Sequence, residues 1–253
     1  MGLDKNEILM NAKIFFKESI IENHIANTKK LIKLKEFNVN PFLAIYLANY
    51  LTGEVNSKSI AKALIYPRVL GSSITTSFGT HLQNFCSRVL TGYGSTAQGI
   101  DVEFIDAIDG RKKYCQIKAG PNTINKDDIK TIMDHFKGVR NLARTNNTKI
   151  DISDLIVGVF YGTKEELSQH YKKIDEEYPV YVGQEFWYRI TGNENFYYDL
   201  IEAIVEVSEE IEKKGENEKD LLDDVIDELS KEIEKSTIFK EYLNKKNQRM
   251  SSN

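Results

Sequence analysis

Two short stretches of this sequence combine acidic, amide and basic side chains at a spacing that could support hydrolytic chemistry. In the first, Asp101 and Glu103 are two residues apart, and in the second, Gln116 and Lys118 are two residues apart. Side chains two positions apart on a β-strand point to the same face. Oxygen ligands can hold a hard divalent cation, and a neighbouring ammonium group can orient or deprotonate an attacking water. The two pairs therefore indicate metal-assisted hydrolysis of a phosphodiester bond.

The elements that must position these side chains are two predicted strands, residues 100–108 and 113–119. Between them, Asp109-Gly110 is a signal for a tight hairpin turn, so the strands are expected to pair side by side. If their polar faces coincide, the acid, the amide and the lysine converge on one spot. The same pattern is also typical of a hairpin whose polar face is simply solvated, so the hairpin alone does not establish a site.

The sequence that follows predicts an alternating α/β pattern. Leu155 to Tyr161 is a continuous apolar run, as expected for a strand covered on both faces. The helix before it, 126–144, has an expected buried face of Ile129, Ile132, Met133, Phe136 and Leu142. Helix 164–173, strand 179–182 and helix 184–190 come next, with Phe186 and Trp187 expected in the core. This alternation predicts an α/β fold.

Helices are predicted on both sides of this region. On the N-terminal side they cover parts of 4–36 and all of 42–51, 57–66 and 75–90, with Pro67 expected to stop the third and a glycine-rich link, 92–99, after the last. On the C-terminal side, Leu221, Val225, Leu229 and Ile233 recur every fourth residue. This spacing predicts a long amphipathic helix lying on the body of the protein, and a dimerisation helix is the alternative. The expected division is an N-terminal helical region, 1–59, a core, 60–195, and charged C-terminal helices, 196–253.

Composition and charge exclude several classes of protein. Two cysteines, Cys86 and Cys115, stand in contexts that predict burial, and the four histidines lack paired ligand spacing, so no zinc site is expected. No apolar run approaches the ~20 residues that span a bilayer, and the first residues do not resemble a signal peptide. No membrane association and a cytoplasmic location are therefore expected. The net charge is −4, but acidic residues are concentrated beyond Glu202, which leaves the remainder slightly basic and compatible with a nucleic-acid partner.

Several motifs together resemble a known family. Gly-Ile-Asp101-Val-Glu, followed by a hairpin and Gln116-Ile-Lys118-Ala-Gly, is similar to the PD-(D/E)XK nuclease signature. Further short segments resemble, in matching order, the branch of type II restriction endonucleases that cuts GGNCC-containing palindromes. These segments are Asn40-Pro41-Phe42, Phe78-Gly79, Asp109-Gly110-Arg111, Lys118-Ala-Gly, Ile156-Val-Gly-Val-Phe-Tyr-Gly162 and Val180-Tyr-Val-Gly-Gln-Glu-Phe-Trp187.

The resemblance implies a restriction-endonuclease-like fold, with a mixed sheet flanked by helices and helical N- and C-terminal extensions. It also implies Mg²⁺ dependence and a homodimer that cuts both strands of double-stranded DNA at a short palindrome. A cognate DNA methyltransferase is the expected genetic partner. A repair or junction-resolving nuclease and a catalytically inactive DNA-binding protein are the alternatives.

Within this family pattern, Asp101 is the expected principal metal ligand, Gln116 and Ile117 are further metal-binding positions, Lys118 assists the water, and Glu103 assists the metal. The family usually has Asp or Glu where this chain has Gln116, and a neutral amide binds a divalent cation less strongly than a carboxylate. Either Gln116 serves as a neutral ligand while another acid supplies charge, or catalysis has been lost. Related nucleases often place an acid on the preceding helix, where this chain offers Gln83, Asn84 and His81, the last expected to be structural.

DNA contacts are expected in the loop and helix start after the lysine. The candidate residues are Asn122, Thr123, Asn125, Lys126 and Lys130. Asn and Lys side chains can read base edges or hold phosphate, and the N–H groups at a helix start favour phosphate. A well-capped helix, with Asn125 as its N-cap, explains the same residues equally well. Lys137, Arg140 and Arg144, at helical spacing, could line the same cleft or form a solvated face.

Overall fold

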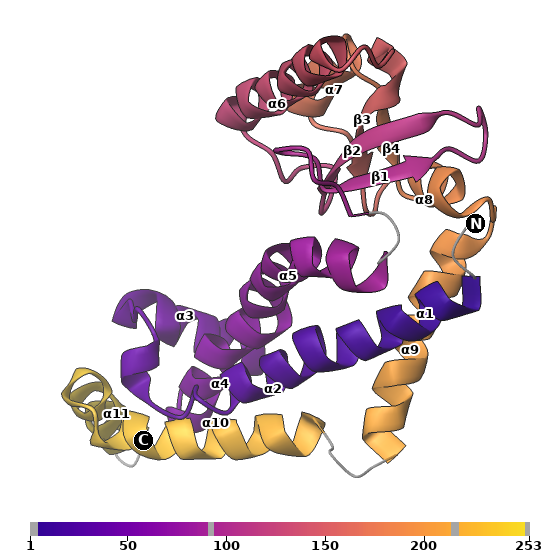
Figure 1. Ribbon diagram of the computed structural model, residues 1–253. Helices are drawn as coiled ribbons and strands as arrows, with labels where there is room; N and C mark the ends of the chain where they lie inside the picture. The colour runs from indigo at the N-terminus through magenta and orange to yellow at the C-terminus, as the bar shows by residue number, and fades with distance from the viewer. Residues whose placement is uncertain (1–4, 91–93, 214–217, 251–253) are drawn as a thin grey trace. The chain divides into compact units, whose positions relative to one another are not determined.

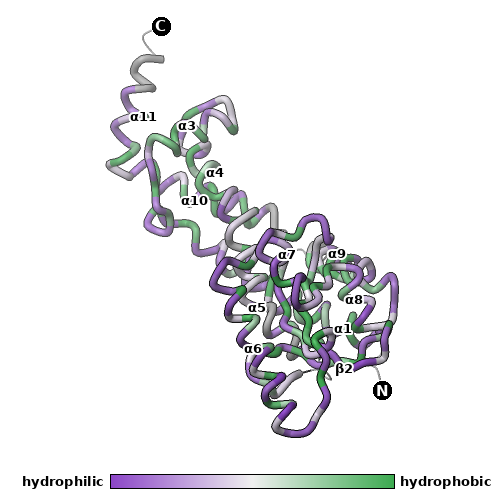
Figure 2. The backbone as a smooth tube through the Cα atoms, turned by 90° about the horizontal axis from the view of Figure 1, so that it is seen from above, coloured by the Kyte–Doolittle hydropathy of each residue, from purple (hydrophilic) through white to green (hydrophobic). Residues whose placement is uncertain are grey.

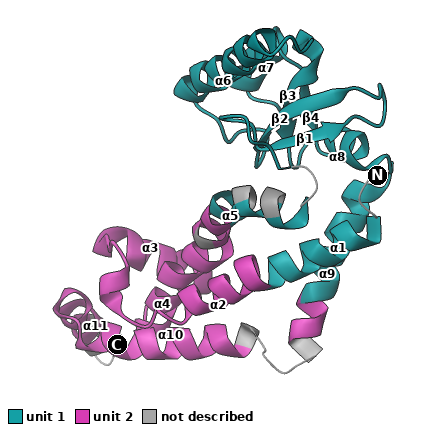
Figure 3. Cartoon of the chain, in the orientation of Figure 1, with its two compact units in different colours: residues 1–17, 78–207 teal, residues 18–77, 208–253 magenta. Residues whose placement is uncertain are grey.

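The computed structural model describes residues 5–90, 94–213 and 218–250, and the chain forms two compact units (Figure 3). Unit 1 combines residues 1–17 with 78–207, and unit 2 combines residues 18–77 with 208–253. This division differs from the three consecutive regions expected from the sequence, because helices from both ends of the chain pack together. The first two residues of the glycine-rich link, Gly92 and Tyr93, lie outside the described residues. No described helix is long and apolar enough to cross a membrane.

Unit 1 is built on a four-stranded mixed sheet in the order β1-β2-β3-β4 (Figure 1). Its strands are β1 (Val102–Ile105), β2 (Lys112–Lys118), β3 (Leu155–Val159) and β4 (Val180–Val182). β1 pairs antiparallel with β2, whereas β2 with β3 and β3 with β4 are parallel. Parallel neighbours need crossover connections. These contain α6 (Lys126–Thr145) with the 3-10 turn η4 (Ile152–Asp154), and then α7 (Gln169–Asp175). The α/β prediction, with a mixed sheet flanked by helices, is confirmed.

Alternation along β3 separates the two faces of the sheet. Val157 and Val159 belong to a core that α6 and α7 cover, with Phe136 and Tyr171 among its members. On the other face Gly158 lies under the ring of Phe186 from α8 (Gln184–Thr191), so closely that an added Cβ would stand 2.1 Å from Phe186 Cε2. Both faces of β3 are buried, as the apolar run predicted.

An aromatic cluster continues the core on the α8 face. Trp187 and Phe186 are fully buried, as predicted, and Trp187 Nε1 donates to the Phe160 carbonyl at 3.0 Å. Rings from α1 (Lys5–Phe15) and α5 (Ile74–Val89) pack here, with the Phe85 centroid 5.0 Å from Phe160 and 5.2 Å from Phe15. Cys115 is buried as expected, and the Cys86 side chain lies outside the described residues. These contacts attach the N-terminal helix to the sheet.

The connection between β1 and β2 is longer than the four residues, 109–112, expected between the predicted strands. Ile105 pairs with Lys112, so six residues, 106–111, lie between the paired positions. Asp106 holds this loop: its carboxylate accepts from the Ile108 N–H at 2.8 Å and from Arg189 at 2.8 Å. Gly110, at φ 68°, donates to the Asp106 carbonyl. The hairpin is confirmed, but its connection is two residues longer than expected, because a buried acid and a distant arginine stabilise a wider loop.

Two predicted helices differ in detail. In α6, Ile129, Ile132 and Phe136 are buried as predicted, but Val139 is buried and Leu142 is 54% exposed. The helix expected at 164–173 begins only at Gln169, as α7.

Unit 2 is helical (Figure 3). Pro67 was expected to end the helix at 57–66, but the helical run continues beyond it. α4 (Ser57–Pro67) continues through a π-helical segment, η3 (Arg68–Ser73), directly into α5. Proline has no N–H to donate to the preceding helical turn. The i→i+5 hydrogen bonds of a π-helical segment allow the chain to remain helical past it. The other elements are η1 (Phe16–Ile21), α2 (Glu22–Thr28), η2 (Leu34–Glu36), α3 (Pro41–Thr52), α9 (Phe196–Lys213), α10 (Glu218–Lys235) and α11 (Thr237–Met250), of which η1 and α9 extend into both units.

The core of unit 2 lies between α3, α4 and α10. Val225, Leu229 and Ile233 of α10 are buried against Ile60 and Ile65 of α4, which confirms the amphipathic helix expected there. Figure 2, in which hydrophobic residues are green, shows green along α3 and α4.

Candidate active site

Asp101 lies just before β1, and its carboxylate contacts β2. Its backbone N–H donates to the Cys115 carbonyl at 2.9 Å, and its Oδ2 accepts from the Ile117 N–H at 2.7 Å. Regular pairing of β1 with β2 ends at Val102. Beyond it, the Asp101 side chain accepts the hydrogen bond that a backbone carbonyl of a longer strand would accept. In a strand, the N–H and C=O of one residue point to the same edge. The Ile117 carbonyl therefore faces the edge on which the Asp101 carboxylate lies.

Gln116 and Lys118 share the α6 face of the sheet, as alternation predicted. Their partners on β3 are Val157 and Val159, which belong to the core under α6. Gln116 is 4% exposed, and its Nε2 lies 3.3 Å from His135 Nδ1 on α6. If the amide nitrogen donates to this ring nitrogen, the amide oxygen is the atom left to meet a cation. Lys118 is half-buried at the end of β2.

His135 is a residue that the sequence reasoning missed. Its ring packs against Gly99, where an added Cβ would stand 2.2 Å from His135 Cγ, and Gly99 has a φ of +76°. Only glycine tolerates both the backbone conformation and the close ring. The signal in the sequence was its place three residues after Ile132, on the side of the helix that faces the sheet.

Glu103 is on the same side as Tyr114, its partner on β2, and its carboxylate is already engaged. It accepts from the Ser95 hydroxyl at 2.5 Å and pairs with Lys112 at 2.6 Å. The hydrogen bond and the charge of this carboxylate raise the pKa of Lys112, against the opposing effect of burial. Glu103 therefore helps to fix the hairpin, and a role beside a metal would require it to exchange these partners.

The oxygen atoms that this part of the sheet could offer a cation are those of the Asp101 carboxylate, the Gln116 amide and the Ile117 carbonyl. These are hard oxygen donors of the kind that Mg²⁺ accepts while keeping several water ligands. Within the described part of the chain, no three His, Cys, Asp or Glu side chains form a group that could hold a metal ion. The residues fit a Mg²⁺ site that has a single protein carboxylate, and a half-buried lysine follows it on the same strand.

The loop after Lys118 is held by its own hydrogen bonds. The Gly120 carbonyl accepts from the Thr123 hydroxyl at 2.8 Å and from the Tyr171 hydroxyl at 3.1 Å. Burial raises the pKa of Tyr171 to about 12, so this donor stays protonated at neutral pH. The Asn125 side-chain oxygen caps α6 by accepting from the N–H groups of its first turn at 2.8 and 3.2 Å. Of the predicted DNA-contacting residues, Thr123 and Asn125 thus have structural roles, while Asn122, Lys126 and Lys130 are exposed.

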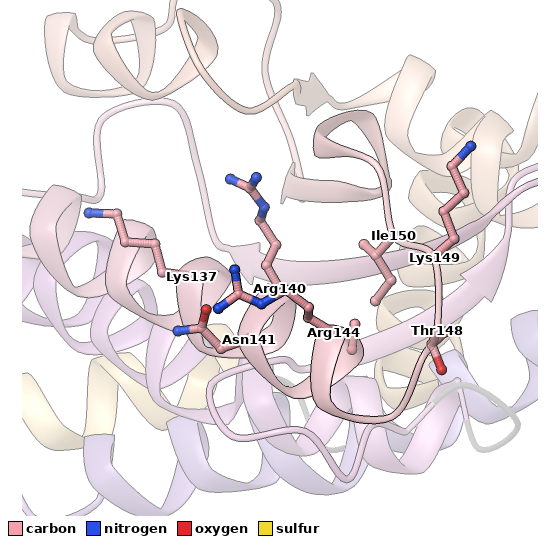
Figure 4. A pocket seen from close by; sticks show the side chains of 8 residues that line it. Lys137, Arg140, Asn141, Arg144, Thr148, Lys149 and Ile150 are labelled. Carbon is pink, nitrogen blue, oxygen red and sulfur yellow. The ribbon is translucent and has the colours of Figure 1, made fainter.

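A basic hollow of about 520 Å³ lies at the C-terminal half of α6 (Figure 4). Arg140, Asn141 and Arg144 come from neighbouring turns, and Lys149 from the segment after the helix stands at the other end (Figure 4). Among the residues that the structure describes, none of those that line the hollow is acidic, although Lys137 on its rim lies 3.9 Å from Asp134. The residues for which the sequence left a cleft or a solvated face open therefore line a concave cationic surface, which suits a phosphate backbone.

The helix before the sheet adds no acid at the positions considered. His81 is half-buried and Asn84 is exposed on α5, while the side chain of Gln83 lies outside the described residues.

Two comparisons with known proteins bear on this arrangement. The family model described as Type II restriction endonuclease EcoO109I matches residues 8–212, which is well over half of the chain and includes the whole sheet. A search of curated proteins finds no match.

Proposed function

Because this chain belongs to the Type II restriction endonuclease EcoO109I family, we propose that it cuts double-stranded DNA at a short palindromic site in a Mg²⁺-dependent reaction. The observation that carries this proposal is the 2.7 Å hydrogen bond from the Ile117 N–H to Asp101. It holds the acid against β2 at Ile117, the residue that lies between Gln116 and Lys118 in the sequence. A PD-(D/E)XK-type centre needs an acid and a lysine at these positions.

In this proposal, Asp101, Gln116 and the Ile117 carbonyl hold the ion. When bound, Mg²⁺ would stabilise the charge that develops on the scissile phosphate. Asp101 is kept in place by the hydrogen bond to β2, so it need not reorganise as the reaction proceeds. The Lys118 ammonium group, at the end of the same strand, orients the attacking water toward the phosphorus. Glu103 could assist the metal only if Lys112, its ion-pair partner, moved away.

His135 gives a physical reason why an amide could serve where the family usually has an acid. A glutamine can present either its oxygen or its nitrogen, and only the oxygen can bind a cation. The contact with His135 favours the orientation in which the nitrogen faces α6. The burial of Gln116 keeps water from competing for the amide.

DNA is proposed to approach over the exposed residues after β2 and the basic hollow on α6.

Cutting both strands of a palindrome needs two active sites related by a twofold axis, so the working form is proposed to be a homodimer. A GGNCC-like site is the proposed target class, because the segments that resemble that branch occur in matching order between residues 40 and 187. A methyltransferase that protects the same site is the proposed genetic partner.

The direct test is digestion of phage DNA by the full-length protein in Mg²⁺, with Ca²⁺ as the matched non-catalytic condition. Discrete fragments whose ends map to one short palindrome would support the proposal. Fragments without a common sequence at their ends would instead identify a nuclease of another specificity.

One observation favours a second candidate, a DNA-binding protein that no longer cuts. Gln116, which occupies a position where the family usually has an acid, is a buried neutral amide. Binding of duplex DNA without any cleavage in Mg²⁺ or Mn²⁺ would establish this alternative.

A further inference from the structure

Tyr161 is an exposed aromatic residue just beyond the end of β3, where this strand runs beside the end of β2. Lys118, the last residue of β2, pairs with Val159, and the Phe160 N–H donates to the Lys118 carbonyl at 2.9 Å. The next residue along the chain, Tyr161, is 41% exposed. The proposed active site gives this side chain no role, although it lies near the lysine strand.

The Tyr161 ring reaches across from β3 to the chain that follows β2. A Cβ added to Gly120 would stand 2.4 Å from Tyr161 Cζ and 2.5 Å from its hydroxyl oxygen. The end of the ring therefore occupies the space that a side chain at position 120 would take. Gly120 is two residues after Lys118, and two residues of extended chain span at most roughly 7 Å. The Tyr161 hydroxyl thus lies near the end of the strand that carries the proposed water-orienting lysine.

The backbone around Tyr161 is tightly packed. A Cβ added to Gly162 would stand 2.9 Å from Pro121 Cγ, and a Cβ added to Gly183 would stand 2.3 Å from the Gly162 carbonyl oxygen. The Pro121 carbonyl also accepts from the Ser168 N–H at 3.0 Å. The segments that follow β2, β3 and β4 therefore pack against one another, and they hold the base of the Tyr161 side chain in place.

The hydroxyl of Tyr161 is open to a ligand. Within the described parts of the chain, no protein group forms a hydrogen bond with it. Tyr171 differs in this respect, because its buried hydroxyl donates to the Gly120 carbonyl at 3.1 Å. Glu166, on the same loop as Tyr161, is turned to its own backbone and accepts from the Thr163 N–H at 2.8 Å. A tyrosine hydroxyl is a neutral donor, and such donors bind phosphate oxygens of DNA.

We propose that the Tyr161 hydroxyl donates a hydrogen bond to a backbone phosphate of the DNA strand that is cut near Lys118. This inference rests on the proposed function, because it requires duplex DNA at the end of β2. A tyrosine has only two side-chain torsions to fix, so a ring already held against Gly120 can bind the strand with little loss of side-chain freedom. Tyr161 thus contacts the DNA and fixes its backbone, and it takes no part in proton transfer.

The test is duplex binding in Ca²⁺ by the full-length protein, compared between the wild type and Tyr161→Phe. This variant loses the hydroxyl and keeps the ring, so its melting temperature should match that of the wild type. We expect binding to weaken about tenfold or more, as for the loss of a hydrogen bond to a charged group. Because a neutral hydroxyl displaces no counterions, the salt dependence of binding should stay the same. Tyr242→Phe is the matched control, since Tyr242 is 40% exposed on α11, and it should bind as the wild type does.

Gly120→Ala tests the position of the ring independently. The added methyl group overlaps the end of the Tyr161 side chain, so the ring must move away. We expect Gly120→Ala to weaken binding as much as Tyr161→Phe does. The double variant should bind no more weakly than either single variant, because both changes remove the same contact. Losses that add in the double variant would contradict this shared contact.

Three other outcomes would overturn the proposal. If the wild type binds and cuts DNA while Tyr161→Phe binds equally well, the contact is absent and the proposed function stands. If Tyr161→Phe cuts at a different sequence, the side chain reads bases, since phosphate contacts carry no sequence information. A wild-type protein that neither binds nor cuts duplex DNA would contradict the proposed function itself, and this contact with it.

Discussion

Replacing Asp154 by asparagine would remove one of the two carboxylates that compensate a fully buried lysine. Lys113 is 0% exposed, and its Nζ lies 3.5 Å from Asp154 Oδ1 and 2.5 Å from Asp109 Oδ2. Arg111 also binds Asp154, with its Nε donating to Oδ1 at 2.7 Å. Asp154 is therefore a carboxylate shared by two cations, at the point where η4 leads into β3. Asparagine keeps a similar shape and removes only the charge.

The expected loss follows from the burial of these groups. Removing one partner of a buried ion pair costs about 3–5 kcal/mol. Because Asp109 stays beside Lys113 and is partly exposed, we expect the lower end, about 3 kcal/mol. For a chain of this size, about 1 kcal/mol shifts Tm by roughly 2–4 °C, so Tm should fall by roughly 6–12 °C.

Thermal melting followed by circular dichroism measures this change, and Asp151→Asn is the matched control. Asp151 pairs with the same arginine, but its side chain is 43% exposed, and such a pair contributes at most about 1 kcal/mol. Lys113→Met combined with Asp154→Asn should recover most of the loss, because the buried ammonium group that Asp154 helped to compensate is gone. Equal shifts for Asp154→Asn and Asp151→Asn would refute the role given to the buried charge.

Three further outcomes are expected. Gln116→Glu should raise Ca²⁺ affinity about tenfold, because it adds a charge to the donor set, and calorimetry showing weaker binding would count against Gln116 as a ligand. Burial would raise the pKa of Asp154, but the hydrogen bond from Arg111 outweighs it, so the pKa is lowered. The stabilisation that Asp154 gives the folded protein is therefore present above the pKa of about 3.9 in the unfolded chain, and it is lost as pH falls through the lower pKa in the folded protein. Melting should show a drop in wild-type Tm below about pH 4 that is shallower in Asp154→Asn. Arg140→Ala with Arg144→Ala should weaken DNA binding in Ca²⁺ and reduce the salt dependence by about one unit per lost phosphate contact; an unchanged slope would exclude the hollow from the DNA surface.

The sequence predicted β2 closely because alternation is a local property, whereas the strand expected at 100–108 is a strand only from Val102 to Ile105. Gln116 and Lys118 lie on one face of β2, as their spacing indicated. Asp101 could not be placed in the same way, because it lies outside β1 and reaches β2 through its side chain. Helical spacing placed His135 on the sheet side of α6, but nothing in that spacing indicated that it would meet Gln116.

The same limit explains the errors in the fold. The hairpin loop depends on Asp106 meeting Arg189, which is 83 residues away, so a turn signal at Asp109-Gly110 could not define its length. In α6, Val139 and Leu142 both fit helical spacing, and only the position of the sheet decides which is buried. For α3, the helix was predicted, but the side it buries is set by the fit of two alanines against α4.

The most direct test of the proposed active site is the rate of plasmid cleavage by Lys118→Ala in Mg²⁺, measured beside duplex binding in Ca²⁺. Lys172→Ala, an exposed lysine on α7, is the matched control and should cut at the wild-type rate. We expect Lys118→Ala to lose cleavage by about a hundredfold or more while its DNA affinity stays within about twofold, as for a group acting in proton transfer or water orientation. Cleavage by Lys118→Ala at the wild-type rate would contradict the assignment of this centre.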